Sequence, residues 1–568
     1  QLASGGGGGE QPAGSSRAGA EDLLPFAQPV ARLVEAHVAP RAGSSAELRK
    51  SALSCLRAWA GSVPQALTLR MLAEAHGALL EGLLAALADE DSVEAAADAL
   101  GEVCSLEECS LSVAPGDVLL AATVSERFLR LRAQLGAAAE AGDNDDWAFA
   151  FARALGSFGA CAARPLVCAS AGAGAEAGAL QALVLLMLEC MSHPSYRVAE
   201  NLVDAWVCFG DIPMQARSEA MRLPLFERLL HATVQRCMWP ADGEDVDALD
   251  FEKWRVQSGS ELITCCLGAL GGAAFSSALA SLLPAELPTC AQAWAGAWRR
   301  VEVVAFALAS VHVEFKTRLR TSAPPSAPPT TPTHDSPRGA KGPSEAEALA
   351  LDKISIDSLL AQSLGLALSL PPLAKERGGE GNVASVVDWR LLHAFAHLMA
   401  LFGGWLKLRP QLVEPTLDFL LTAAAARAPG GDGVALSGLL ASAGRAMPAG
   451  AREAPRLHLT AADAFRNLCS HCATQLAGGS FVDVLVRAVA PLLDGGARLV
   501  LGDGSRLGQD ARVPLAEGIG RLVGLLEGSE PEVASQALRN LASTPARALQ
   551  NLLNMLTAHA GGGGLGGE

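Results

Sequence analysis

The stretch VEAAADALGEV, at residues 93–103, has the apolar spacing of one helix face, given by Val93, Ala96, Ala97, Leu100 and Val103. Two later stretches repeat its small–small–large pattern: TAADAFRNLCS at 460–470 and EVASQALRNLAS at 532–543. Small residues let neighbouring backbones approach, and a single helix of this kind cannot bury its face alone, so the unit has to recur and stack. The sequence therefore predicts an all-α fold, an α-solenoid of HEAT-like antiparallel helix pairs that forms a superhelix.

Local signals indicate where some of these helices begin and which faces they bury. Asp91 and Glu94 have the spacing of a capping box, in which each side chain satisfies backbone N–H groups of the first turn. Pro531 favours the first turn of a later helix. We expect the inner face of that helix to consist of Ala534, Ala537, Leu538 and Leu541.

Composition supports the helical prediction. Half of the 568 residues are apolar but only 5% are aromatic, and Tyr196 is the one tyrosine. A chain rich in Ala and Leu favours helices over strands and has enough apolar surface to form a core. The longest apolar run, near Ala182–Met191, is interrupted by Glu189. Because a bilayer requires about 20 apolar residues, we expect no membrane insertion and a soluble chain.

The chain divides into five predicted parts. Residues 1–20 are Gly/Ser-rich and expected to be disordered, and 21–320 are expected to form HEAT-like repeats. Residues 321–345 are proline-rich and predict a disordered loop, 346–560 predict further HEAT-like repeats, and 561–568 predict a disordered Gly-rich tail. The loop contains Thr331-Pro332 and Ser336-Pro337, which proline-directed kinases could modify, although an unmodified spacer is the simpler interpretation.

Charge and cysteine content narrow the function classes. The formal net charge is −16, which does not favour direct nucleic-acid binding and suits basic partners. The 13 cysteines are scattered among apolar neighbours. With no recognisable signal peptide, this pattern is typical of a reducing compartment, the cytosol or the nucleus, where cysteine serves as a small apolar residue.

Motifs that carry chemistry are incomplete. Cys469 and Cys472 have zinc-type spacing, but a structural zinc requires four ligands and none follow nearby, so we expect buried core cysteines. His393 and His397 are four residues apart without the glutamate of a metalloprotease helix. Nucleophile-elbow and phosphate-loop motifs are absent from the sequence. The sequence predicts no enzyme, no catalytic residue, no cofactor and no metal.

Two acidic segments beside tryptophans are the candidate partner-binding sites. Such segments can bind Lys/Arg-rich proteins through charge-assisted contacts, and solvated inter-helix loops are the alternative. The candidate residues are Asp143, Asp145, Asp146, Asp242, Glu244, Asp245, Asp247, Asp250, Glu252 and Trp254. Arg299-Arg300 and Arg318-Leu-Arg320 are possible anion sites, with exposed helix surface as the simpler interpretation.

Residues 191–210, MSHPSYRVAENLVDAWVCFG, are the most distinctive stretch. They resemble a helix pair of nuclear transport receptors in the importin-β superfamily, of the transportin-3 and importin-13 type. Further similar segments follow the family's order: 48–64, 226–240, 250–272, 388–421 and 460–472. The resemblance covers about residues 21–560, and its most similar block, 388–472, is closer to transportin-3.

The resemblance implies a karyopherin, a monomer that binds protein cargo such as Arg/Ser-rich splicing factors and releases it under the control of Ran-GTP. It also implies contact with nucleoporins and shuttling between cytoplasm and nucleus through the nuclear pore in the nuclear envelope. The chain is similar to the middle of such a receptor, so no Ran-contacting or cargo-binding residue is transferred from the family. The alternative is a HEAT-repeat scaffold without a transport role, such as a phosphatase regulatory subunit or a tubulin-array protein.

Overall fold

The computed structural model describes residues 16–38, 45–105, 110–141, 145–169, 174–240, 248–288, 291–320, 345–370, 389–424, 455–477, 479–493, 509–527 and 529–542. Within these ranges the regular structure is helical throughout, with no strand. Two compact units divide the chain, unit 1 (Gln1–Gly271) and unit 2 (Gly272–Glu568). Each is an α-solenoid of HEAT-like antiparallel helix pairs, which confirms the predicted fold class. The division falls between Gly271 and Gly272 and not at the proline-rich segment, of which 321–344 lie outside the described residues.

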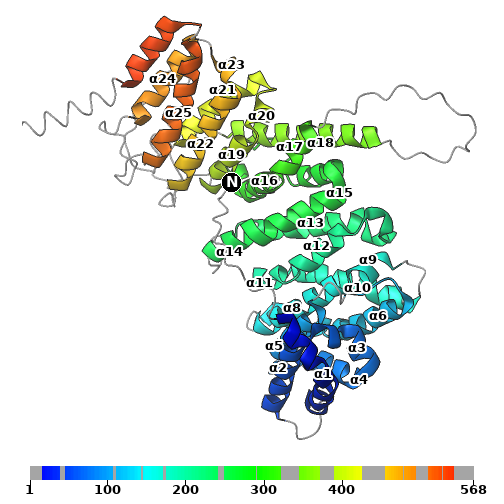
Figure 1. Cartoon of the computed structure of the whole chain (residues 1–568). Helices are drawn as coiled ribbons and strands as arrows, with labels where there is room; N and C mark the ends of the chain where they lie inside the picture. The colour runs from blue at the N-terminus through cyan, green and yellow to red at the C-terminus, as the bar shows by residue number, and fades with distance from the viewer. Residues whose placement is uncertain are drawn as a thin grey trace, which may run out of the picture. The chain divides into compact units, whose positions relative to one another are not determined.

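Unit 1 consists of two layers of helices that follow each other in chain order (Figure 1). Layer A contains α1 (Ser16–Val38), α3 (Leu69–Ala75), α4 (Gly77–Ala86), α6 (Pro115–Arg130), α10 (Ala175–Met191) and α13 (Leu223–Cys237). Layer B contains α2 (Ala46–Ser62), α5 (Val93–Cys104), α8 (Asp145–Cys161), α11 (Tyr196–Glu200) and α12 (Val203–Asp211). The short helices α7 (Arg132–Ala141) and α9 (Ala163–Cys168) continue α6 and α8. Helix α1 starts at Ser16, inside the tract that the sequence predicts to be disordered.

Small residues set the spacing of layer B, as the repeated sequence pattern predicts. Ala96, Ala97 and Leu100 of α5 are fully buried where α5 packs between α2 and α8. On α8, Gly156 lies so close to the backbone before α12 that a Cβ atom would be 1.9 Å from the carbonyl oxygen of Asn201. The layer is therefore held by direct approach of backbones as well as by apolar side chains.

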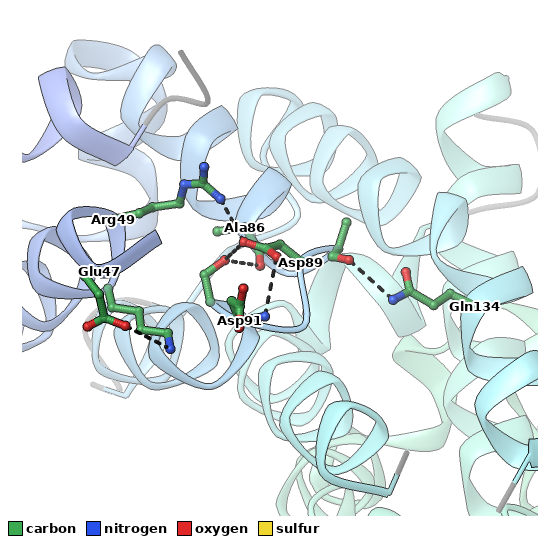
Figure 2. Close-up of polar contacts among 9 residues, drawn as sticks. Glu47, Arg49, Ala86, Asp89, Asp91 and Gln134 are labelled. Atoms are coloured by element: carbon green, nitrogen blue, oxygen red, sulfur yellow. Dashed lines mark hydrogen bonds and ion pairs between the residues drawn. The ribbon is translucent and has the colours of Figure 1, made fainter. Parts of the chain in front are cut away.

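The start of α5 differs from the predicted capping box. The side chain of Asp89, not that of Asp91, organises the preceding turn (Figure 2). Asp89 accepts hydrogen bonds from the Ser92 hydroxyl at 2.9 Å and from the Asp91 N–H at 3.4 Å, and it pairs with Arg49 of α2 at 2.7 Å. Ser92 precedes the helix and Asp91 is exposed, so the predicted role of Asp91 is wrong.

A long apolar helical stretch begins in unit 1 and continues past Gly271 into the residues of unit 2. Helix α14 (Ala248–Trp254) continues through a π turn (Arg255–Gly259) into α15 (Ser260–Ala280). By length and composition, Leu249–Ala280 could cross a membrane, with a mean hydropathy of 1.7 over its best window, so the expectation that no stretch qualifies is wrong. That window is 56% buried within the protein, as in the core helix of a solenoid. Gly271 interrupts α15 with a φ of 76°, a conformation that favours glycine.

Unit 2 repeats the layered plan. Its first layer stacks α16 (Ala291–Ser310), α19 (Trp389–Leu401), α22 (Pro455–His471) and α25 (Gln509–Leu526). After one buried residue each, α16, α19 and α22 continue into α17 (His312–Arg320), α20 (Gly403–Leu406) and α23 (Ala473–Leu476). Against this layer pack α18 (Glu345–Leu368), α21 (Pro410–Ala424) and α24 (Gly479–Leu493).

The last described helix spans residues 531–542 and begins at Pro531, as predicted. Ala534 and Ala537 are buried, at 2% and 1% exposure, and Leu541 is half-buried. Leu538 is 52% exposed, so its predicted place on the inner face is wrong. The buried stripe is narrower than the apolar pattern, and Leu538 lies at its edge.

Asp352 of α18 caps the helical segment that restarts after Gly271. Its carboxylate accepts hydrogen bonds from the N–H groups of Gly272 at 2.9 Å and Ala273 at 2.7 Å. The same carboxylate pairs with Arg318 of α17 at 2.6 Å. A side chain distant in sequence thus satisfies backbone donors that the helix itself leaves unpaired.

We expect Asp352→Ala to lower the free energy of unfolding of unit 2 by about 2 kcal/mol, because two amides and one guanidinium lose a shared acceptor. Asp352→Asn keeps the shape and one acceptor oxygen, so it should recover part of the loss. Urea unfolding followed by circular dichroism measures both variants. An Asp352→Ala protein with an unchanged midpoint would contradict the assigned capping role.

Candidate functional site

A hollow of about 900 Å³ lies on layer B of unit 1. We call it the layer B groove; α2, α5, α8 and α11 line it together with the turn before α5. Its carboxylates are Glu90, Asp91, Glu94, Asp98, Glu102 and Asp146, and its cations are Lys50, Arg57 and Arg197. Acidic groups outnumber basic groups six to three, so the groove has a net negative charge.

Helix α5 supplies the central row of acids. Glu94, Asp98 and Glu102 are four residues apart and share the helix face opposite the buried Ala96, Ala97 and Leu100. Because α5 packs between α2 and α8, this row runs along the middle of the groove.

Part of the negative charge is already paired. Arg57 of α2 binds Asp98 at 2.7 Å and reaches Glu102 at 4.0 Å. Arg153 of α8 binds the other oxygen of Asp98 at 2.7 Å. Asp98 therefore joins three successive helices of layer B.

Three carboxylates remain for a ligand. Within the described part of the chain, Asp91, Glu94 and Asp146 form no ion pair, and all three side chains are exposed. They come from the turn before α5, from α5 and from the start of α8. Their arrangement can bind a cationic segment at several points along its length.

Aromatic side chains support the acidic surface. Trp147 is buried, donates its indole N–H to the Leu87 carbonyl oxygen at 3.0 Å and stacks on Phe151 with a centroid distance of 5.1 Å. Phe149 is half-buried in the groove, with the guanidinium groups of Arg197 and Arg153 at 4.8 and 5.6 Å from its ring centroid. The ring thus already contacts cations, which is the interaction that an arginine-containing ligand would make.

The groove includes one residue of the first predicted acidic segment. Asp146 lines it, Asp145 begins α8 and Asp143 lies outside the described residues. The side chain of Asp145 is also outside the described set. The structure therefore places the end of this segment, beside the buried Trp147, at the groove.

The second predicted acidic segment is described only at its end. Asp242, Glu244, Asp245 and Asp247 lie outside the described residues. On α14, Asp250 is exposed and Glu252 is half-buried. Trp254 is only 2% exposed and packs near Phe251 and Tyr196, with centroid distances of 6.3 and 6.1 Å. The expectation that Trp254 contacts a partner is corrected, because the indole is a core side chain.

Sequence reasoning missed five groove carboxylates: Glu90, Asp91, Glu94, Asp98 and Glu102. For three of them the signal was the four-residue spacing of Glu94, Asp98 and Glu102 on the polar face of VEAAADALGEV. That spacing alone predicts only a solvated face. The arrangement of α2 and α8 on either side of α5 makes it part of a groove.

The remaining motifs have structural roles. Cys469 and Cys472 are fully buried, and burial raises the pKa of Cys472 to about 11 and that of Cys469 further. His393 contacts the Thr460 hydroxyl at 3.1 Å. Of the predicted anion sites, Arg318 pairs with Asp352 and the Arg299 guanidinium lies 5.3 Å from the Trp298 ring centroid. Among the described residues, no His, Cys, Asp and Glu side chains group as a metal site would require.

The comparisons with known proteins found similarity to solved structures alone. No protein-family model matches this chain, and no curated protein matches it. The crystal structure of Kap121p is similar with a TM-score of 0.50 and 11% identity, over 95% of this chain and 43% of that chain. A mutant of Kap121p gives a TM-score of 0.51 and 11% identity, over 93% of this chain and 43% of that chain.

A third similar structure is the karyopherin Kap121p bound to the extreme C-terminus of the protein phosphatase Cdc14p. Its TM-score is 0.47 with 10% identity, over 94% of this chain and 47% of that chain. The chain thus spans less than half the length of these solved structures. The likeness to Kap121p agrees with the α-solenoid fold of both units.

Proposed function

We propose that this chain is part of a nuclear transport receptor of the importin-β superfamily and that it binds basic segments of protein cargo in the layer B groove. The observation that carries the proposal is the set of exposed carboxylates of Asp91, Glu94 and Asp146, which form no ion pair within the described residues and lie in one groove with Trp147 and Phe149. A groove of this charge attracts Lys/Arg-rich chains and disfavours nucleic acid.

The chemistry of the groove is that of binding and not of catalysis. Its polar side chains are carboxylates, guanidiniums, one ammonium and the Ser54 hydroxyl, on helix surfaces and in the turn before α5, and Asp98 is held by Arg57 and Arg153. Each exposed ion pair with a ligand contributes about 0–1 kcal/mol, so affinity comes from several contacts and decreases with salt. Such binding suits a cargo that has to be released again.

Two observations support a more specific proposal about the type of receptor and its cargo. The fold is similar to that of Kap121p, and residues 191–272 resemble transportin-3 and importin-13 in the order of their segments. On this basis the cargo is of the Arg/Ser-rich splicing-factor class, released by Ran-GTP. The receptor would contact nucleoporins and shuttle between cytoplasm and nucleus. A non-transport scaffold, such as a phosphatase regulatory subunit, would share the solenoid but not the response to Ran-GTP.

The test is Ran-dependent release. The longest natural protein that contains this chain is immobilised and loaded with an Arg/Ser-rich splicing-factor domain, and the bound fraction is measured after addition of Ran-GTP or Ran-GDP. We expect Ran-GTP to release most of the cargo and Ran-GDP to release little. Retention of cargo with both nucleotides would favour the scaffold function over transport.

A further inference from the structure

Unit 2 has a second hollow, of about 390 Å³, where α17 and α18 meet α20 and the residues after it. We call it the α17–α20 pocket. Its size is that of a small-ligand site. It differs from the layer B groove in charge, because it combines Lys316, Lys353 and Arg409 with a single carboxylate, that of Asp357.

The arginine of this pocket is held in place. The Arg409 guanidinium lies 3.9 Å from the centroid of the Trp405 ring and pairs with Asp357. Asp357 also accepts a hydrogen bond from the Trp405 indole N–H at 2.9 Å. Trp405 is only 6% exposed, so the surrounding packing holds its ring in position beside the Arg409 guanidinium. A guanidinium has five N–H donors, and Asp357 does not use all of them.

Lysines are scarce in this protein, which makes their position informative. The 568 residues include only seven lysines, and two of the seven, Lys316 and Lys353, line the α17–α20 pocket. Within the described residues, no carboxylate lies within ion-pair distance of Lys353. In a chain with a net charge of −16, this clustering of cations indicates an anionic ligand.

The presence of three cations in one pocket favours a phosphate monoester over a carboxylate. A phosphoserine or phosphothreonine carries a charge of about −1.5 to −2 and three acceptor oxygens, which can engage several cations together. Beside Arg409, Leu408 is 76% exposed at the pocket and offers an apolar surface for the residue that follows the phosphate. Proline is a residue of that kind, apolar and without a backbone donor to satisfy.

We propose that the α17–α20 pocket binds a phosphorylated Ser or Thr followed by proline. One source is this chain itself, because Thr331-Pro332 and Ser336-Pro337 lie in the connection from Arg320, at the end of α17, to Glu345, at the start of α18. Both of these helices line the pocket. A tethered ligand has a high effective concentration. The other source is a phosphorylated segment of another protein.

Fluorescence anisotropy tests the phosphate requirement. A labelled peptide of residues 326–341 is prepared unmodified and with phosphate on Thr331 and Ser336, and each form is titrated with the full, unphosphorylated chain. We expect the phosphopeptide to bind at least tenfold more tightly. Lys353→Glu should remove at least tenfold of that affinity. Lys253→Glu, which changes an exposed lysine of α14 by the same charge, should leave it unchanged.

Equal affinity of the two peptides, or equal losses for Lys353→Glu and Lys253→Glu, would overturn the proposal. The source is assigned by phosphorylating the full chain on Thr331 and Ser336 and repeating the titration. If the chain's own segment occupies the pocket, the added phosphopeptide binds at least tenfold more weakly; undiminished binding supports the pocket and assigns it to another protein. The pocket shares no residue with the layer B groove, so either proposal can fail alone.

Discussion

Gly156→Ala is expected to destabilise unit 1 by about 3 kcal/mol or more, at the upper end of the effects of overpacking a core. The new Cβ would lie 1.9 Å from the Asn201 carbonyl oxygen and 3.0 Å from its carbon, far inside contact distance. Because both partners are backbone, no side-chain rotation relieves the overlap. Helix α8 and the start of α12 would have to separate, and layer B would lose its closest approach.

Gly136→Ala is the matched control, since Gly136 lies in α7 and a Cβ atom added there would meet no neighbouring group within 4 Å. The same substitution there should stabilise the protein by up to about 1 kcal/mol, because alanine favours a helix over glycine. Thermal unfolding and hydrogen exchange of α8 and α12 measure the two variants. Similar stabilities for the pair would show that close backbone approach does not hold this layer.

Arg217→Ala is expected to cost unit 1 about 3 kcal/mol, since charged hydrogen bonds to buried groups are strong. Arg217 is 3% exposed and donates to the carbonyl oxygens of Ile212 and Gly210, both at 2.8 Å. Its guanidinium also lies 4.5 Å from the centroid of the Phe226 ring on α13. Burial lowers the pKa of this guanidinium. One side chain therefore fixes the connection between α12 and α13.

Arg217→Lys should recover only part of the stability, because a single ammonium cannot reproduce the planar fork that reaches two carbonyl groups and stacks on a ring. Arg228→Ala, an exposed position on α13, should change the free energy of unfolding by less than about 0.5 kcal/mol. Urea titrations of Arg217→Ala, Arg217→Lys and Arg228→Ala measure these differences in the free energy of unfolding. If Arg217→Ala unfolded at the same urea concentration as Arg228→Ala, the buried arginine would have no structural role.

The parts of the fold that depend on local periodicity could be predicted from the sequence. Phe465, Cys469 and Cys472 are buried on one face of α22 and its end, as their spacing indicates. The sequence does not show that Asp89 and not Asp91 organises the start of α5. The hydrogen bonds of Asp89 with Ser92 and Asp91 are local, but its ion pair is with Arg49, which lies far earlier in the chain on α2. Contacts between successive repeats decide such details, and they leave no local pattern.

Less of the candidate site than of the fold could be predicted from the sequence. Asp146 was identified from its acidic neighbours and Trp147, and it lines the layer B groove. Glu94 and Asp98 were not identified, because their function requires α2 and α8 on either side of α5. Trp254 shows the opposite error, since a tryptophan beside acids suggests a surface but this ring packs with Phe251 in the core.

The central claim, that the layer B groove binds basic protein segments, is tested most directly by matched charge reversals. One variant replaces Asp91, Glu94 and Asp146 by lysine; the control replaces the exposed Glu126, Glu140 and Glu227, which lie outside the groove. Binding of a labelled Arg-Ser repeat peptide is measured by anisotropy. The account predicts that the groove variant loses about 10- to 100-fold in affinity while the control stays within about threefold. Equal losses in both variants, or none in the groove variant, would contradict it.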